Sequence, residues 1–193
     1  MTRHGGTIVR RVSSRRRDIA TRAVELFADR GFHGVSVGDV GAASGISGPA
    51  IYKHFTGKEE VLAHALVDIS TELLETGRER AGAEPGPEAA LDALIAWHID
   101  FAVSHPAYIV VQEREWSRLD ADARASVRRL QLAYVDLWVE VLRRLRDDLS
   151  RAEARAAVQA TFGLLNSTPH SARIGEDDLR SLLARMARAA LLG

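Results

Sequence analysis

The chain has 193 residues, of which 46% are hydrophobic and 27% are charged, and its formal net charge at pH 7 is zero. This composition supports a sizeable buried core and excludes a disordered chain. The absence of cysteine excludes disulfide bonds, thiolate zinc sites and cysteine nucleophiles. No stretch approaches the roughly 20 uncharged apolar residues of a membrane helix, and the first residues lack the apolar segment of a signal peptide. We therefore expect a cytoplasmic protein with no membrane partner.

The neutral net charge conceals an uneven distribution along the chain. Residues 1–58 carry ten basic and four acidic side chains, a net charge of +6, whereas residues 59–193 carry 16 basic and 22 acidic side chains, a net charge of −6. A basic segment joined to an acidic remainder suits a protein that neutralises phosphates at one end. A solvated, charged tail is the alternative explanation of the same pattern.

Apolar residues recur at helical spacing along most of the chain, which predicts an all-α fold. The first helix is expected to begin near Ser14, a possible N-cap, and to end at Gly31. A short helix from Ser36 and a second one after Ser47 are expected to flank a tight turn at Gly45, because glycine can adopt the positive φ that such a turn demands.

Six further helices are expected in the rest of the chain, over about residues 58–80, 87–105, 106–116, 120–148, 150–165 and 176–192. Ser150 and Glu153 have the spacing of a capping box, and residues 166–175 form a loop. The prediction is about nine helices in two domains. A flexible basic arm at residues 1–13 precedes a three-helix, helix-turn-helix domain at residues 14–57, and residues 58–193 form a C-terminal helical domain.

Residues 36–62, SVGDVGAASGISGPAIYKHFTGKEEVL, resemble the DNA-binding signature of the TetR/AcrR family of transcriptional regulators in order and spacing. The matching residues are Gly45, Ile46, Ser47, Ile51, Tyr52, His54, Phe55, Lys58 and Glu59. The resemblance covers about residues 14–65. The chain departs from the family pattern at Gly41 and Ser44, where alanine is usual, and at Gly48 and Pro49, where a polar residue and then glycine are common. We expect these departures to affect base recognition more than the fold.

The resemblance implies that the second short helix enters the major groove of double-stranded DNA. Four small residues at its start would let it approach the base edges: Ser47, Gly48, Pro49 and Ala50. Lys53 is expected to point outward between buried Ile51 and Phe55 and to donate to guanine. Phosphate contacts are expected from Arg15, Arg16, Arg17, Ser36, Tyr52, His54 and Lys58. Purely structural roles remain open for Tyr52 and His54, and Arg10 and Arg11 of the arm either enter a minor groove or belong to a disordered tail.

Aromatic residues are spread over the predicted C-terminal helices, which the family's fold would gather around a cavity. Such a stripe usually marks plain core, and that alternative stays open. A ligand-responsive regulator needs a site of this kind, lined by Trp97, His98, Phe101, Tyr108, Gln112, Trp116, Tyr134, Trp138, Phe162 and Asn166. His64 is a further polar candidate. The apolar lining favours a small hydrophobic effector, such as an acyl-CoA or another lipid-derived metabolite. The histidine spacing predicts no metal site.

The last two helices are amphipathic and are expected to pair with those of a second copy. Contacts in this homodimer are expected from Val158, Phe162, Leu165, Leu179, Leu183 and Met186, and its symmetry predicts a palindromic operator. The resulting hypothesis is a DNA-binding transcriptional regulator, a repressor released by its ligand. A nonspecific or architectural DNA-binding protein is the alternative. We expect no enzyme and no cofactor, because GxSxG and GxGxxG motifs are missing and Gly57-Lys58 does not fit a phosphate-binding loop.

Overall fold

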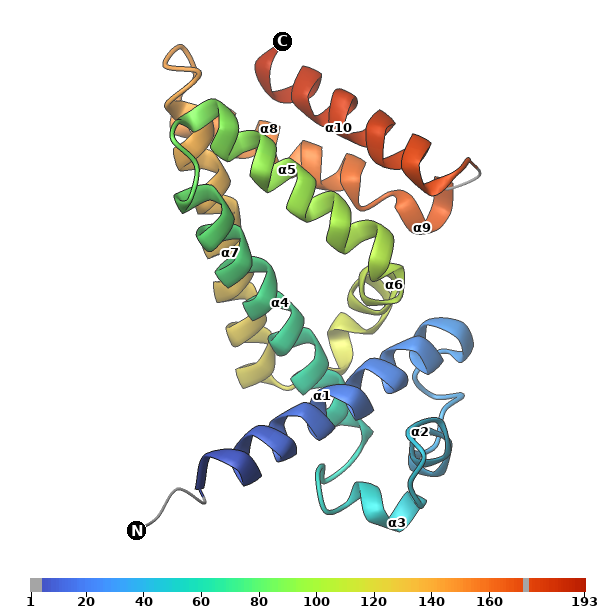
Figure 1. Cartoon of the computed structure of the whole chain (residues 1–193). Coiled ribbons are helices and arrows are strands. Elements are labelled where there is room, and N and C mark those ends of the chain that lie inside the picture. Colours follow the sequence, from blue (N-terminus) through green and yellow to red (C-terminus); the bar gives the residue numbers. More distant parts are fainter. Residues whose placement is uncertain (1–4, 172–173) are drawn as a thin grey trace. The chain divides into compact units, whose positions relative to one another are not determined.

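The computed structural model describes the backbone of residues 5–171 and 174–193 and the side chains of residues 14–170 and 174–193. Within these residues the chain is helical and contains no β-strand, which confirms the predicted all-α class (Figure 1). The chain divides into two compact units, Met1–Asp68 with Val110–Ala125, and Ile69–Ile109 with Ser126–Gly193. Residues 58–68 and 110–125, which the predicted boundary after Gly57 assigns to the C-terminal domain, therefore pack in the first unit.

Helix α1 (Gly5–Arg30) begins earlier than expected. The predicted start at Ser14 was wrong, because no glycine or proline interrupts the chain between Thr7 and Arg30 and arginine favours a helix. Residues 5–13 of the predicted arm are thus helical, whereas residues 1–4 and the side chains of Arg10 and Arg11 lie outside the described residues. The helix ends as predicted at Gly31, where φ is 73°.

The predicted helix-turn-helix is present as α2 (Val37–Ala43) and α3 (Gly48–Ile51). Ser36 and Asp39 cap α2 reciprocally, since Asp39 N donates to Ser36 Oγ at 3.1 Å and Ser36 N donates to Asp39 Oδ2 at 2.8 Å. Gly45 has a φ of 67°, as the tight turn requires. Helix α3 is only four residues long, and the chain continues through turns at residues 52–54.

In the first unit α2 packs against α1, and α3 packs against α2. The centroids of the Phe27 and Phe32 rings lie 5.0 Å apart, so Phe32 folds back onto α1. Ile51 and Phe55 are buried on either side of the turn that follows α3. Burial of these two side chains holds the turn in place from within.

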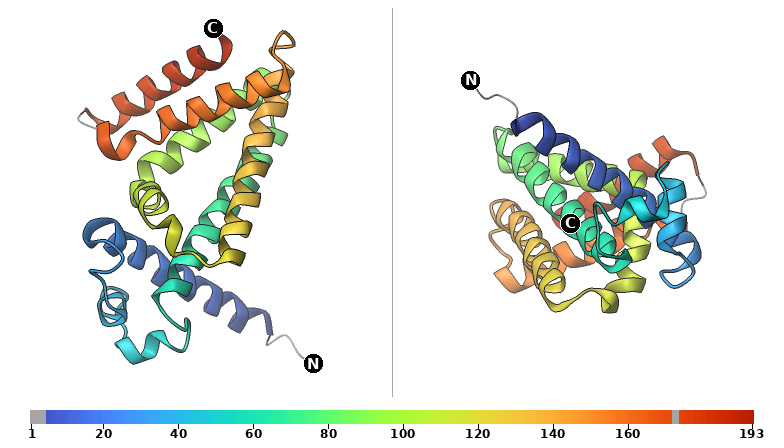
Figure 2. Two further views of the ribbon diagram at one scale, coloured as in Figure 1. Left: turned by 180° about the vertical axis from the view of Figure 1, so that it is seen from behind. Right: turned by 90° about the horizontal axis from the view of Figure 1, so that it is seen from below.

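The second unit consists of α5 (Pro87–Ser104), α8 (Arg151–Leu165), α9 (Thr168–Ser171), α10 (Glu176–Leu192) and parts of α4 (Lys58–Gly82), α6 (Pro106–Glu115) and α7 (Ala121–Arg143). Helix α10 packs on both α5 and α8, and the left view of Figure 2 shows it beside α8. The predicted capping box at Ser150 and Glu153 is present at the start of α8.

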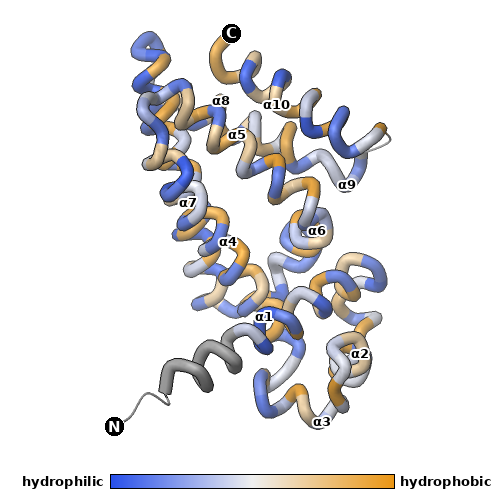
Figure 3. Tube along the Cα trace, viewed as in Figure 1, coloured by the Kyte–Doolittle hydropathy of each residue, from blue (hydrophilic) through white to orange (hydrophobic). Residues whose placement is uncertain are grey.

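Several predicted boundaries in the C-terminal part shift. The short helix η1 (Trp116–Arg118) follows α6, so Trp116 does not belong to that α-helix. Helix α7 ends at Arg143 rather than near Asp148, and α9 interrupts the predicted loop 166–175. Hydrophobic and hydrophilic residues alternate along α10 in Figure 3, as expected for an amphipathic helix.

Candidate functional site

The segment of α3 and the following turn exposes the side chains that DNA recognition requires. Tyr52 is 60% exposed, and Lys53 and Pro49 also face solvent. Ser47 is exposed and precedes α3 as its N-cap, yet its hydroxyl makes no capping hydrogen bond. The buried Ile51 and Phe55 of the same segment provide the anchor, so the outer face is both accessible and fixed.

Glycines permit a close crossing of α2 and α3. A Cβ atom on Gly41 would lie 2.9 Å from both Gly48 N and Ile46 O, and one on Gly48 would lie 3.2 Å from Gly38 Cα. The departures from the family pattern at Gly41 and Gly48, which we had assigned to base recognition, therefore have a packing role in this chain.

Arg16 fastens α1 to the end of the α3 segment. Its guanidinium donates to Glu60 Oε1 at 2.9 Å and to the carbonyl oxygen of His54, and its Cζ lies 4.1 Å from the centre of the Phe55 ring. Glu60 also accepts a hydrogen bond from Thr56 N at 2.7 Å. The bonds from Thr56 and Arg16 lower the pKa of Glu60 to about 2. Arg16 thus acts from inside the unit as a positioning residue.

Glu60 was missed by the sequence analysis. The usual capping-box spacing from Thr56 leads to Glu59, one residue earlier. The carboxylate that binds Thr56 belongs instead to Glu60, which lies four residues on. Only the three-dimensional position of Arg16 distinguishes the two acids.

Other predicted phosphate ligands also have partners within the first unit. Lys58 Nζ donates to Phe32 O at 2.7 Å and to Val35 O at 3.1 Å, which ties the start of α4 to the loop before α2. Arg15 donates to the carbonyl oxygen of Ser44 at 2.8 Å, and Arg17 forms an ion pair of 2.8 Å with Asp68.

These bonds do not exhaust the donors of the basic groups, because an ammonium has three N–H groups and a guanidinium five. Ser36 likewise remains exposed while its hydroxyl bonds Asp39. His54 is half-buried and its Nδ1 has no partner, which favours a partly structural role. Phosphate contact by these residues stays a prediction.

The second unit contains an aromatic cluster, which we define as His98, Phe101, Tyr134, Trp138 and Phe162. The members come from α5, α7 and α8. The ring of Phe162 lies 4.5 Å from His98, 5.5 Å from Tyr134 and 5.0 Å from Trp138 between centroids. Phe101 meets His98 at 5.9 Å. These rings form one contact network inside the unit.

The histidine of the aromatic cluster is held in a neutral state. His98 is only 3% exposed, and burial lowers its pKa to about 4. Its Nε2 lies 3.1 Å from Oδ1 of Asn166, the C-cap residue of α8, and this hydrogen bond opposes the shift. The imidazole is therefore uncharged at neutral pH.

Three polar atoms of the aromatic cluster are buried without a hydrogen-bond partner: His98 Nδ1, Tyr134 Oη and Trp138 Nε1. Burial raises the pKa of Tyr134, and the nearby Trp138 indole opposes this shift without reaching the geometry of a hydrogen bond. Because buried polar groups normally have partners, three together mark this place as a candidate recognition site.

The structure gathers six of the ten predicted ligand-binding residues, namely the aromatic cluster and Asn166. Trp97 is not part of it, since its Nε1 donates to Leu73 O at 3.1 Å and Arg80 lies 4.6 Å from its ring. Trp97 directly precedes His98, so the two side chains leave α5 in different directions.

The remaining candidates lie further from the aromatic cluster or in the other unit. Tyr108 contacts His105, which in turn stacks on Phe101 at 5.8 Å. Gln112 and Trp116 are half-buried residues of the first unit. His64 also belongs to the first unit, where its ring lies 5.5 Å from Phe55.

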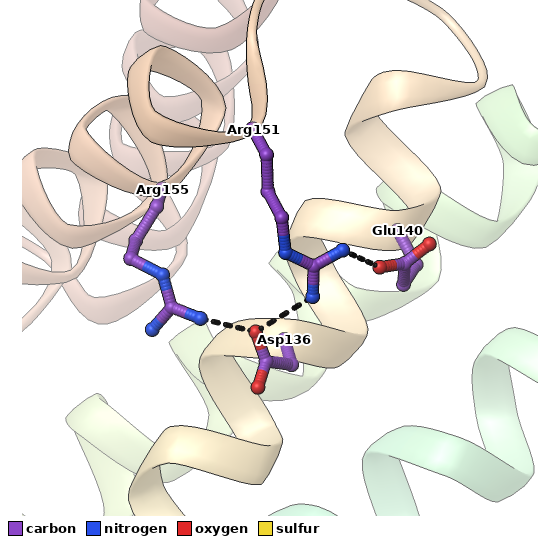
Figure 4. Close-up of polar contacts among 4 residues, drawn as sticks. All are labelled: Asp136, Glu140, Arg151 and Arg155. Carbon is purple, nitrogen blue, oxygen red and sulfur yellow. Dashed lines mark hydrogen bonds and ion pairs between the residues drawn. The ribbon is translucent and has the colours of Figure 1, made fainter.

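An ion-pair network joins α7 to α8 on the outside of the second unit (Figure 4). Arg151 donates to Asp136 at 3.1 Å and also to Glu140, and Arg155 donates to the same oxygen of Asp136. Asp136 lies between Tyr134 and Trp138 in the sequence. The network thus fixes the segment of α7 that carries two members of the aromatic cluster against α8.

Four of the six predicted dimer contacts are not exposed at the surface of a single chain. Val158, Leu165, Leu179 and Leu183 are buried within their own chain. The apolar stripe of an amphipathic helix identifies its most buried face, and here the rest of the unit already covers that face. Phe162 is half-buried in the aromatic cluster, and Met186 is 44% exposed. Leu182, which was not predicted, is 36% exposed one helical turn before Met186.

The residues that the structure describes contain neither a membrane-spanning helix nor a metal-binding group. No single helix there is long and apolar enough to span a bilayer, although Pro87–Ser104 and Pro106–Arg118 meet the criteria together as a pair bent by 79°. The same residues contain no group of three or more His, Asp or Glu side chains that could hold a metal ion.

Two family models match successive parts of the chain. Residues 19–65 match the family described as bacterial regulatory proteins, tetR family, and residues 84–170 match the tetracyclin repressor-like C-terminal domain. The first match contains α2, α3 and Lys53, and the second contains every member of the aromatic cluster.

Individual relatives agree with these matches. The HTH-type transcriptional repressor KstR2 of Mycobacterium tuberculosis is 28% identical over 132 residues, which are 68% of this chain and just under two thirds, 66%, of the repressor. A TetR-family regulator from Bordetella parapertussis has the same fold, with a TM-score of 0.78 at 24% identity over 89% of this chain and 93% of that one. AibR, solved with isovaleryl coenzyme A and operator DNA, has a TM-score of 0.73 at 19% identity over 89% and 97% of the two chains.

Proposed function

The chain belongs to the TetR family of bacterial regulatory proteins, and on that basis we propose that it is a homodimeric repressor of a palindromic operator, released by a small hydrophobic ligand. The observation that carries the proposal is the exposed face of Tyr52 and Lys53, which is anchored from below by Ile51 and Phe55. A rigid face that presents hydrogen-bond donors is what reading of base edges and phosphates requires.

In this proposal the basic residues of the first unit divide into two groups. Lys53 donates to a base edge and Tyr52 to a phosphate, because both are exposed. Arg16 and Lys58 act mainly by holding the α3 segment and the loop before α2 in position, since their hydrogen bonds run inward.

The ligand-binding part of the proposal rests on the second unit. The aromatic cluster combines apolar rings with a few buried polar atoms, a composition typical of small-molecule sites. The relative AibR was solved with an acyl coenzyme A, and KstR2 is described as a repressor. We therefore propose an acyl-CoA or another lipid-derived metabolite as effector, acting in the cytoplasm.

Dimerisation would use the outer face of α10. Leu182 and Met186 are exposed apolar residues four positions apart, so they lie on one stripe of the helix. A two-fold symmetric contact through this stripe would pair two copies of α3 with the two halves of a palindrome.

The test is selection of binding sites from random duplex DNA, followed by competition with excess unrelated DNA. We expect one palindromic sequence to be enriched and to bind saturably at a competitor excess that abolishes other binding. The alternative, an architectural DNA-binding protein, predicts equal loss of binding to all sequences. That result would contradict the proposed function.

A further inference from the structure

The three unpartnered polar atoms of the aromatic cluster belong to rings that contact one another. His98 and Tyr134 stack with 5.8 Å between centroids, Trp138 meets His98 edge-on at 5.9 Å, and Tyr134 and Trp138 are 6.1 Å apart. All three residues are less than 5% exposed. Buried polar groups left without partners cost free energy, so this arrangement is unfavourable for packing alone.

The hydrogen bond between His98 and Asn166 determines which atoms of this site can donate and which can accept. Oδ1 of Asn166 can only accept, so His98 Nε2 carries the proton that it donates. In the neutral imidazole Nδ1 is then an acceptor. Trp138 Nε1 can only donate, and the Tyr134 hydroxyl can do either. The site therefore offers two donors and one acceptor within an apolar surrounding.

The side chains in and around the aromatic cluster determine which charge a bound ligand group can carry. The aromatic cluster contains no cationic side chain, and Arg80, whose positive charge acts on Tyr134, pairs with Asp100 at the surface. A carboxylate or phosphate buried here would lack a counter-charge and would be strongly disfavoured. A carbonyl oxygen can accept from Tyr134 and Trp138, and a hydroxyl can in addition donate to His98 Nδ1.

We propose that Tyr134, Trp138 and His98 recognise an uncharged oxygen, a hydroxyl or a carbonyl, of a hydrophobic ligand. The inference rests on the proposed ligand-released function and specifies the chemistry that this site selects. The thioester carbonyl of an acyl-CoA meets the requirement, whereas its phosphates do not. A ligand that lacks this oxygen would leave the polar atoms of the site unpaired and would therefore bind more weakly.

Three probes of equal chain length test the proposal: 1-decanol, 2-decanone and decanoate. Calorimetry gives their affinities for the full chain at pH 7.5, and the indole N–H resonance of Trp138, assigned with Trp138→Phe, reports contact directly. We expect both neutral probes to bind and shift this resonance, and decanoate to bind at least about tenfold more weakly. Tyr134→Phe should weaken the neutral probes about 3- to 10-fold.

Thr161→Val is the matched control. It also removes a buried hydroxyl from the second unit, but that hydroxyl donates to Ala157 O at 2.9 Å and lies outside the aromatic cluster. We expect this variant to bind all probes like the unmodified chain. The loss seen in Tyr134→Phe is then specific to the unpartnered phenol.

The proposal is overturned if neither neutral probe binds, if the Trp138 resonance does not move, or if Tyr134→Phe binds them as tightly as the unmodified chain. Buried water would then satisfy the polar atoms. Operator binding measured on the same preparations separates this failure from that of the proposed function. Specific operator binding with no probe binding rejects only the present inference, and probe binding without specific operator binding rejects only the repressor.

Discussion

Burial of the His98 imidazole makes the stability of the protein depend on pH. Its pKa falls from 6.5 to about 4 on folding, so the unfolded chain binds more protons between these values. The contribution of His98 to the free energy of unfolding is therefore complete above pH 6.5 and decreases as the pH falls toward 4, by about 2 kcal/mol between pH 7.5 and 5.0. The pKa of Glu60 is lowered from 4.5 to about 2, so its contribution is lost only at lower pH.

Urea unfolding at the two pH values measures this effect. In His98→Gln the difference between the free energies of unfolding at pH 7.5 and pH 5.0 should be smaller by about 2 kcal/mol. His33→Gln is the matched control, because it removes a solvent-exposed imidazole. Equal pH dependence in His98→Gln and the unmodified chain would show that His98 is not buried in its neutral form.

At the scale of the element, α4 approaches the aromatic cluster through a glycine. A Cβ atom on Gly77 would lie 2.8 Å from Tyr134 Cε2, whereas one on Gly82 of the same helix would meet nothing within 4 Å. Alanine gains up to about 1 kcal/mol in helix propensity at either position. At Gly77 overpacking against a buried ring costs about 1–3 kcal/mol. Gly77→Ala should therefore lower the urea midpoint and Gly82→Ala should not, and a midpoint raised equally in both would contradict this packing.

Local sequence patterns predicted the elements wherever a short-range interaction decides the boundary. The capping boxes at Ser36 and Ser150 and the glycine turn at Gly45 are examples. The early start of α1 also follows from local helix propensity, whereas the turns after α3 accompany the long-range burial of Phe55.

The same distinction between short-range and long-range interactions explains which features of the candidate sites could be predicted from the sequence. Tyr52 and Lys53 could be predicted as exposed from the buried positions that flank them. That Arg16 and Lys58 bond inward depends on residues 23 or more positions away in the chain. On α10, Leu183 and Met186 are both apolar, and only the packing of the whole unit buries one and exposes the other.

At the scale of the whole molecule, the proposed dimer depends on the exposed stripe of α10. Met186→Asp and Leu182→Asp should shift the protein toward monomer, because a charge cannot be buried unpaired in an apolar contact. Leu132→Asp is the matched control, since Leu132 is an equally exposed leucine on α7. Sedimentation velocity at micromolar concentration measures the state. A monomeric unmodified chain, or a dimer that both α10 variants leave intact, would contradict the proposed interface.

The affinity of Lys53→Ala for the selected operator tests the central claim most directly. If Lys53 reads a base, its loss should weaken operator binding by about 1–3 kcal/mol and affect unrelated DNA much less. Arg143→Ala is the control, because it removes an exposed positive charge from the second unit. It should leave the ratio of operator to unrelated DNA affinity unchanged. An operator affinity that Lys53→Ala does not alter, or a loss that is equal on operator and unrelated DNA, would contradict sequence reading by the α3 segment.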